Sequence, residues 1–398
     1  MLNPTESALI ESISLDQIVA DTQELIAAQS ENPGSVEAEA VSVLQAMCER
    51  IGAEVTLQEV QPGRANLHAS VGPADAPSIL FLGHSDVVPA GEGWEGDPFS
   101  PRVFLGSIVG RGATDMKGGL AAVVAAMGAV ASTRPDIRLE LLCTVDEEDQ
   151  ALGALSAIEH LEGRSLTACI VAEPTNLDVV IGCRGSTNLQ IDITGKSAHA
   201  GRPEDGVSSI YGAGVLIEKV REAHQAASRV EADPLLGRPT WNVGTIEGGT
   251  GTSMVPQKTS VTIDRRTMPG EAPQDILAEL LRSVEEELAS EDIAPAEGLT
   301  LSGSVTLDMP GFKTPDDSNV PTLAKQALAD VGRDVSLTGW TAACEGGFVA
   351  RATQSPTIIM GPGDINNQAH QPNESVQIDD LLSAAQAYAL MAVRLHKA

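Results

Sequence analysis

The segment Ile79-Leu80-Phe81-Leu82-Gly83-His84-Ser85-Asp86 is a short apolar run that ends in a glycine, a histidine and an acid. A run of this length between polar residues is typical of a buried strand. Similar runs recur at 137–145 and 168–172, and helical stretches at 117–132 and 151–162 alternate with them. This alternation is typical of βαβ units. The segment therefore predicts an α/β layer with a mostly parallel central sheet.

The same α/β style extends towards both ends of the chain. Before the segment, the apolar periodicity predicts helices at 15–28 and 36–51 and a strand at 54–58. After residue 310 it predicts a helix at 320–331, a strand at 357–360 and a closing helix at 378–395. These elements belong to one α/β domain.

The middle of the chain has a different order of elements. From about residue 184 the pattern predicts a β-α-β-β-α-β series, with elements at 187–194, 207–226, 240–247, 259–266, 273–289 and 300–307. Such a series forms a two-layer α+β sandwich by itself. A chain of 398 residues also exceeds the usual size of a single core. We therefore expect an α/β domain of residues 1–183 and 304–398, interrupted by an inserted two-layer α+β domain of residues 184–303.

The composition excludes some classes of partner. With 25 basic and 55 acidic residues, the net charge is −30, which repels nucleic acid and anionic membranes. The first 16 residues contain no basic segment ahead of an apolar one, so they do not resemble a secretory signal. The odd, widely spaced set of five cysteines suits reduced thiols. We expect a cytoplasmic protein without nucleic-acid or membrane partners.

Candidate metal ligands directly follow the apolar strands. His84, Glu148 and Glu173 come after three successive strands, His370 follows the strand at 357–360, and Asp115 lies in a glycine-rich loop. A single histidine or acid of this kind is usually structural or solvated. However, the carboxyl ends of parallel strands meet at one edge of a sheet, so these side chains are expected to converge. Imidazole and carboxylate ligands without cysteine suit zinc, manganese or cobalt.

The ordered motifs also resemble those of a known family. They are Gly83-His84-Ser85-Asp86-Val87-Val88-Pro89, Gly110-Arg111-Gly112-Ala113-Thr114-Asp115-Met116-Lys117-Gly118-Gly119, Asp146-Glu147-Glu148, Ala172-Glu173-Pro174-Thr175, Gly195-Lys196-Ser197-Ala198-His199-Ala200-Gly201, Gly361-Pro362-Gly363 and Ala369-His370-Gln371-Pro372. The series resembles the dinuclear-metal family of acetylornithine deacetylase, succinyl-diaminopimelate desuccinylase, the aminoacylases and the glutamate carboxypeptidases. The resemblance covers nearly the whole chain.

The resemblance implies a cofactor of two divalent metal ions, which we expect to be zinc, with cobalt or manganese as alternatives. His84 and Glu173 would hold one ion, Glu148 and His370 would hold the other, and Asp115 would bridge both. Asp86 would orient the imidazole of His84 through its second nitrogen. Glu147 would act as general base towards a water held by the metals.

The resemblance also implies that residues 1–183 and 304–398 form the metal-binding catalytic domain and that the inserted domain of residues 184–303 is a lid and dimerisation domain. It implies roles for individual residues as well. His199 matches a family histidine that stabilises the oxyanion in the partner subunit's site. Arg266 matches an arginine that binds the substrate carboxylate, and Arg265 is an adjacent alternative, since only one of two neighbours on a strand can face the site. Ser253 and Cys344 stand where relatives carry Asn and Thr or Ser near the substrate, so these two departures bear on substrate identity.

Three functions are compatible with this pattern. The motif around His370 looks closest to acetylornithine deacetylase, which predicts amide hydrolysis in a small N-acyl amino acid by a homodimer. A dipeptidase, a carboxypeptidase or a desuccinylase could use the same site on another substrate. A catalytically silent dimeric binding protein is the third interpretation, but retention of all five ligands together with Glu147 argues against it.

Overall fold

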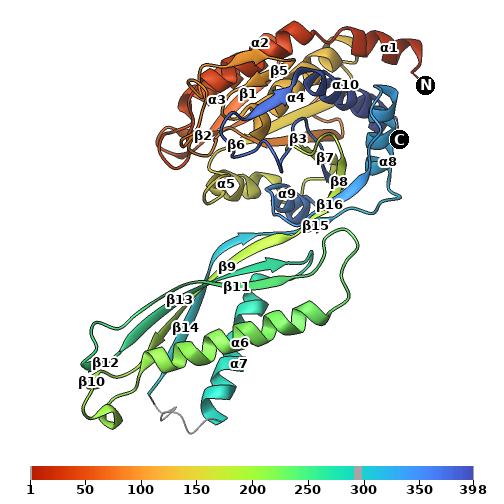
Figure 1. Cartoon of the computed structure of the whole chain (residues 1–398). Helices are drawn as coiled ribbons and strands as arrows, with labels where there is room; N and C mark the ends of the chain where they lie inside the picture. Colours follow the sequence, from red (N-terminus) through yellow and green to blue (C-terminus); the bar gives the residue numbers. More distant parts are fainter. Residues whose placement is uncertain (1, 291–297, 398) are drawn as a thin grey trace. The chain divides into compact units, whose positions relative to one another are not determined.

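The computed structural model describes residues 2–290 and 298–397, and the chain divides into two compact units (Figure 1). The first unit comprises Met1–Gly182, Lys313–Gly339 and Glu345–Ala398, and the second comprises Cys183–Phe312 and Trp340–Cys344. The second unit thus ends later than residue 303, because its last long strand continues to Met309. Residues 291–297 of the expected insertion lie outside the described residues.

The first unit is built on a large mixed sheet with the strand order β1-β2-β6-β3-β7-β17-β8-β15, and β16 also pairs with β8. The strands are β1 (Glu54–Gln61), β2 (Arg64–Val71), β3 (Ser78–His84), β6 (Arg138–Thr144), β7 (Leu166–Val171), β8 (Val179–Cys183), β15 (Phe312–Lys313), β16 (Leu337–Trp340) and β17 (Thr357–Ile359). The adjacent strands β6, β3, β7 and β17 run parallel. The predicted fold class, an α/β domain with a mostly parallel central sheet, is confirmed.

Helices cover both faces of this sheet, with α4 and α10 on one face and α5 and α9 on the other (Figure 1). The helices of the unit are α1 (Pro4–Glu11), α2 (Leu15–Ala27), α3 (Ala38–Arg50), α4 (Gly118–Thr133), α5 (Leu152–Leu161), α8 (Asn319–Asp330), α9 (Gly346–Thr353) and α10 (Ile378–Leu395). The stretch Ala113–Thr133 is long and apolar enough to cross a membrane. Here it is a core helix, because α4 packs against α2 and α10.

A small three-stranded sheet connects distant parts of the first unit. It pairs β4 (Arg102–Phe104) with β5 (Ser107–Val109), and β5 with β18 (Ser375–Gln377). All three strands are short, and β5 is buried along its length. The sheet therefore carries the chain segment just before Ser375 to the loop that follows Val109.

The second unit is the expected β-α-β-β-α-β sandwich. Its strands β9 (Gly185–Thr194), β11 (Thr240–Gly248), β13 (Lys258–Thr267) and β14 (Thr300–Met309) form an antiparallel sheet in the order β11-β13-β9-β14. The helices α6 (Ser209–Arg229) and α7 (Pro273–Ser290) pack with this sheet. A short pair, β10 (Ala198–His199) with β12 (Met254–Val255), is added to the predicted elements.

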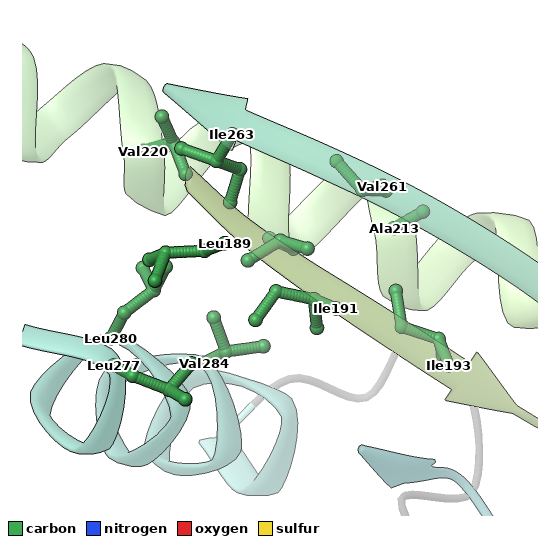
Figure 2. Close-up of a cluster of buried hydrophobic side chains, with 11 residues drawn as sticks. Leu189, Ile191, Ile193, Ala213, Val220, Val261, Ile263, Leu277, Leu280 and Val284 are labelled. Atoms are coloured by element: carbon green, nitrogen blue, oxygen red, sulfur yellow. The ribbon is translucent and has the colours of Figure 1, made fainter. Parts of the chain in front are cut away.

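Alternating residues of β9 form the core of the second unit (Figure 2). Leu189, Ile191 and Ile193 are buried, and they point towards the helices as expected for side chains two positions apart. The cluster is completed by Val261 and Ile263 of β13, Ala213, Leu216 and Val220 of α6, and Leu277, Leu280 and Val284 of α7. Strands direct every second side chain to one face, and helices repeat about every 3.6 residues. Because the strands and the helices of this unit both contribute apolar side chains at these spacings, the two layers pack as a sandwich.

Candidate metal centre

The predicted ligands meet at the carboxyl edge of the parallel strands. His84 is the last residue of β3, Glu148 lies in the loop after β6, and Glu173 follows β7. His84, Asp115 and Glu173 are buried, whereas the side chain of His370 is 50% exposed. Most of the cluster is therefore buried in the core, and it is accessible to solvent on the side of His370.

The distances divide these side chains into two groups that share one carboxylate. Nε2 of His84 lies 3.2 Å from Oδ1 of Asp115 and 3.4 Å from Oε1 of Glu173. Nε2 of His370 lies 3.3 Å from Oδ2 of Asp115 and 3.3 Å from Oε2 of Glu148. Each imidazole thus faces a glutamate of its own, and the two oxygens of Asp115 face different imidazoles.

The donor set fits divalent cations. Ligand atoms of His84, Asp115 and Glu148 all lie within 4.8 Å of one another. Oε1 of Glu148 is buried and has no hydrogen-bond partner, which is costly for a carboxylate oxygen unless a cation binds it. Burial, followed by the charge of Asp115, raises the pKa of Glu173 to about 7. These acids repel one another, and bound cations would remove that repulsion.

Hydrogen bonds to Glu374 hold the loop that carries Asp115. The fully buried carboxylate of Glu374 accepts the backbone N–H groups of Gly112 at 3.1 Å, Thr114 at 2.8 Å and Asp115 at 2.9 Å. It also accepts a charged hydrogen bond from Nη1 of Arg111 at 2.6 Å. Glu374 directly precedes β18, and the pairing of β18 with β5 places it beside this loop, although the two are far apart in sequence.

Asp86 contacts both His84 and the loop that carries Glu147 and Glu148. Its Oδ1 accepts the backbone N–H of Glu147 at 3.2 Å, and its Oδ2 accepts the N–H of Glu148 at 3.0 Å and Nδ2 of Asn32 at 2.9 Å. Nδ1 of His84 lies 3.0 Å from the backbone carbonyl of Asp86 and 3.4 Å from its Oδ1. Nδ1 is therefore turned towards Asp86, while Nε2 is left for the carboxylate cluster.

The turn before Glu147 has an unusual backbone conformation. Asp146 has a φ of 67°, a left-handed conformation that is rare outside glycine. Its Oδ1 accepts Nδ2 of Asn32 at 2.9 Å and lies 2.9 Å from Nη1 of Arg64. These contacts offset the cost of the conformation, which directs the next two residues towards the site.

Burial favours the protonated forms of both Glu147 and Glu148. Burial raises the pKa of Glu147 well above its ordinary value, and the charges of Glu173, Glu148 and Glu345 raise it further against the opposing effect of His84. A carboxyl group whose pKa is raised by burial and by neighbouring acids is suited to exchange protons during a reaction.

Comparisons with known proteins agree with this geometry. The model of the peptidase family M20/M25/M40 matches residues 80–394. The chain belongs to this family. It is 30% identical over 351 residues to an acetylornithine deacetylase of Aliivibrio fischeri, covering 85% of this chain and 86% of that protein. It is 30% identical over 342 residues to a succinyl-diaminopimelate desuccinylase of Dechloromonas aromatica, covering 82% and 85%.

A solved structure shows the same fold. A dinuclear metal binding peptidase of the M20 family from Bacillus subtilis is 18% identical, and it superposes with a TM-score of 0.70 over 95% of this chain and 97% of its own. The predicted family is thus confirmed, and the M20 chain is a metal-dependent hydrolase of amide bonds. The ligand atoms of His84, Asp115 and Glu148 form a candidate metal site in it.

The other predicted site residues of this M20 chain belong to the second unit. His199 is exposed on β10, and its Nδ1 accepts the backbone N–H of Gly201 at 3.0 Å. In the neutral ring the proton is then on Nε2, which leaves this nitrogen as a donor. Ser253 is exposed beside it, and its carbonyl accepts the N–H of Ala200 at 3.0 Å.

The alternation along β13 separates the two candidate arginines. Arg265 lies on the buried face, where its Nη2 is 2.6 Å from Oε1 of Glu271 and its guanidinium stacks 4.9 Å from the ring centre of Trp241. Arg266 lies on the opposite face, with its side chain 37% exposed and its Nε 3.2 Å from Oδ1 of Asp264. Of the two, Arg266 is the one available to a ligand.

Cys344 has a more enclosed position than its predicted role suggests. The side chain is buried, and its Sγ lies 3.9 Å from Sγ of the buried Cys183. A contact between Cys344 and substrate stays a prediction. The residues that the sequence analysis missed near the metal centre are Asn32, Glu345 and Glu374, which contact the site only through long-range hydrogen bonds.

Proposed function

We propose that this M20 hydrolase cleaves the amide bond of a small N-acyl amino acid with a free α-carboxylate, releasing a carboxylic acid and the amino acid. The observation that carries the proposal is the pair of imidazole–glutamate groups that share Asp115 beside Glu147. The 30% identity to a deacetylase and a desuccinylase supports acyl amino acids as the substrate class.

In this proposal, His84 and Glu173 would hold one divalent ion, Glu148 and His370 would hold the second, and Asp115 would contribute to both. Zinc suits these ligands, as cobalt and manganese also do. Bound divalent ions would polarise the substrate carbonyl and lower the pKa of a water from about 15.7 towards about 7. The protein would hold these ligands in position before the reaction. Hydrogen bonds to Asp86 fix the loop of Glu147 and Glu148, and hydrogen bonds to Glu374 fix the loop of Asp115.

Glu147 would move the protons of the reaction. Its carboxylate would take a proton from the attacking water and return it to the nitrogen of the leaving amine. His199 would donate Nε2–H to the oxyanion, since its Nδ1 is occupied by Gly201. Arg266 would bind the substrate carboxylate through its planar, forked guanidinium. We also propose that Ser253 and Cys344 shape substrate choice, and that the enzyme is a cytoplasmic homodimer.

A hydrolysis screen tests this function. The metal-free protein, and the protein reloaded with zinc, cobalt or manganese, should be assayed on acetyl, succinyl, formyl and carbamoyl amino acids and on dipeptides. Activity should require metal, and about two ions should bind per chain, because one carboxylate can serve two ions roughly 4 Å apart. Full activity of protein shown by elemental analysis to be metal-free would refute the proposal. Turnover of dipeptides alone would favour a peptidase.

A further inference from the structure

Glu345 is a buried acid behind the metal centre that the proposed chemistry does not use. It directly precedes α9 and is 3% exposed. Its Oε2 lies 2.5 Å from Oγ1 of Thr144, the last residue of β6, although 201 positions separate the two residues. Thr144 is in turn the register partner of His84 on β3. Glu345 thus connects the start of α9 to the end of β6, and Thr144 connects it further to the paired end of β3.

The hydrogen bonds of Thr144 indicate where the protons lie. Its Oγ1 also lies 3.1 Å from the backbone carbonyl of Gly83, and that carbonyl can only accept. A hydroxyl group has one proton to donate, so it cannot fully satisfy both Gly83 and an ionised Glu345. Both bonds form if Glu345 carries a proton on Oε2, donates it to Thr144, and leaves Thr144 to donate to Gly83.

The second oxygen of Glu345 supports the same protonation state. Oε1 is buried and has no hydrogen-bond partner. An unpartnered buried oxygen costs more on an ionised carboxylate than on a neutral acid, where it is an uncharged carbonyl. The neutral form of Glu345 is therefore the one that this environment tolerates.

The surrounding charges point in the same direction. Burial raises the pKa of Glu345 to about 8, and nearby carboxylates add to this against the opposing effects of Thr144 and His84. The titratable groups that interact with Glu345 come from the ends of β3, β6 and β7, and they are His84, Asp86, Cys143, Glu147 and Glu173. One more negative charge would be unfavourable among these acids even with two divalent ions bound. The four positive charges of the ions would already face five carboxyl groups, those of Asp86, Asp115, Glu147, Glu148 and Glu173.

We propose that Glu345 is a positioning residue of the metal centre: a neutral carboxylic acid that donates its proton to Thr144 and thereby holds the ends of β3 and β6. It acts through His84 and through the Glu147–Glu148 loop, and it contacts neither substrate nor metal. The effect on turnover rests on the proposed function, whereas the protonation state and the effect on metal binding do not.

Two pairs of variants test this role. Glu345→Leu removes the donor at similar size, and Glu345→Gln restores a neutral donor, because its amide N–H can bond to Thr144. Thr144→Val and Thr144→Ser form the matched pair on the other partner. Loss of an outer contact of this kind should weaken metal binding about 10-fold or more. We expect that loss in the Leu and Val variants, and affinities near that of the wild type in the Gln and Ser variants.

Infrared spectroscopy detects the proton directly. At neutral pH the difference spectrum of wild type minus Glu345→Gln, with and without metal, should show the carbonyl stretch of a protonated carboxylic acid. Bands from other protonated acids, such as Glu147 and Glu173 in the metal-free protein, are common to both spectra and cancel. A merely space-filling role would leave no such band. Absence of the band, or equal metal affinity in Glu345→Leu and Glu345→Gln, overturns the proposal. If Glu345→Leu fails to fold, the Thr144 pair decides. If no N-acyl amino acid is hydrolysed, the infrared spectrum and the metal titration still decide whether Glu345 has this role.

Discussion

Oδ2 of Asp86 accepts the backbone N–H of Glu148 at 3.0 Å, so the acid that follows His84 by two residues also anchors the loop after the neighbouring strand. Its Oδ1 accepts the N–H of Glu147 at 3.2 Å. The sequence analysis assigned Asp86 the orientation of one imidazole. The structure adds a second task, because both residues of the proposed ligand–base pair depend on the same carboxylate.

We therefore expect Asp86→Ala to weaken metal binding by about 10–100-fold and to lower kcat by more than loss of metal alone explains. The variant removes the carboxylate that contacts the imidazole of His84 and that accepts the backbone N–H groups of Glu147 and Glu148. Titration with a metal-chelating dye gives the affinity, and kinetics at saturating metal give the remaining loss. Asp136→Ala, which removes a half-exposed carboxylate paired with Arg134 on the surface, is the matched control. Unchanged kcat at saturating metal would limit Asp86 to the imidazole.

The neighbouring glutamates should give opposite phenotypes. Glu147→Gln should lower kcat by about 10²–10⁴-fold while the metal content stays near normal, because it removes a general base and leaves the ligands intact. Glu148→Gln should instead lower metal occupancy, since Oε2 of Glu148 faces His370 at 3.3 Å. Elemental analysis and steady-state kinetics on both variants provide the comparison. Exchanged phenotypes would reverse the assignment within the pair.

The proximity of the candidate ligands could be predicted from the sequence because the relevant signals are local. A histidine or an acid lies at the end of β3 and within a few residues of the ends of β6 and β7. Parallel strands bring their carboxyl ends together whatever the lengths of the helices between them. The closing helix also has the predicted bounds, Ile378–Leu395, because its apolar residues recur with a helical period.

The supporting residues were missed because their partners are distant in sequence. Glu345 bonds to Thr144 across 201 positions, and Glu374 bonds to Asp115 across 259. The helix α9 begins with Gly346 and Gly347, which are poor helix formers, so the periodicity gave no sign of it. Strand β2 was also missed, since its mostly buried residues include the polar Asn66 and Ser70 and do not alternate. The roles of these residues depend on contacts that form only in the assembled sheet, so local sequence patterns do not predict them.

Lys117 makes a prediction about pH and stability. It is fully buried, its Nζ donates to the carbonyl of Ala28 at 2.7 Å, and burial lowers its pKa from 10.5 to about 7. Above pH 7 the unfolded chain still binds a proton that the folded chain has released, so this group's destabilising contribution shrinks as the pH rises. Below pH 7 both states bind the proton and the cost is greatest.

Lys117→Met should therefore raise the Tm of the metal-free protein most at pH 7 and below. The gain in the free energy of unfolding should diminish by about 1.4 kcal/mol for each pH unit above pH 7. Thermal unfolding at pH 6, 7, 8 and 9 measures the difference between variant and wild type, with Lys258→Met, at an exposed lysine of β13, as the control. A pH-independent difference would show that Lys117 is charged throughout this range.

Mixed dimers test whether His199 acts on a partner subunit's site. The inserted sheet has open edges at β11 and β14, and such edges pair readily with a second copy of themselves. Homodimers of His199→Ala and of Glu147→Gln should both be nearly inactive. Subunit exchange should restore activity in hybrids, where one site has both Glu147 and the partner's histidine. Exchange that mass spectrometry demonstrates without recovered activity would contradict action in trans.

Arg266 gives the sharpest test of the substrate class. The net charge of −30 is unfavourable to an anionic substrate, so a free carboxylate needs a cationic group at the site. Arg265 is held by Glu271 and Trp241 on the buried face of β13, which leaves Arg266 on the other face. Loss of a charge-assisted contact costs about 1.5–3 kcal/mol, which is roughly 10–100-fold in kcat/KM.

Arg266→Ala should thus damage turnover of the free acid far more than turnover of its amide or methyl ester, which cannot make the ionic contact. Comparing kcat/KM for acid and amide in wild type and variant isolates the interaction from any general loss. Arg221→Ala is the control, because Arg221 is an exposed arginine of the same unit paired with Glu218 on α6. Equal losses on acid and amide would remove the carboxylate contact from the proposal. A wild-type preference for blocked carboxyl groups would change the substrate class, yet the hydrolysis at the metal centre would stand, since neither result involves Asp115 or its two imidazoles.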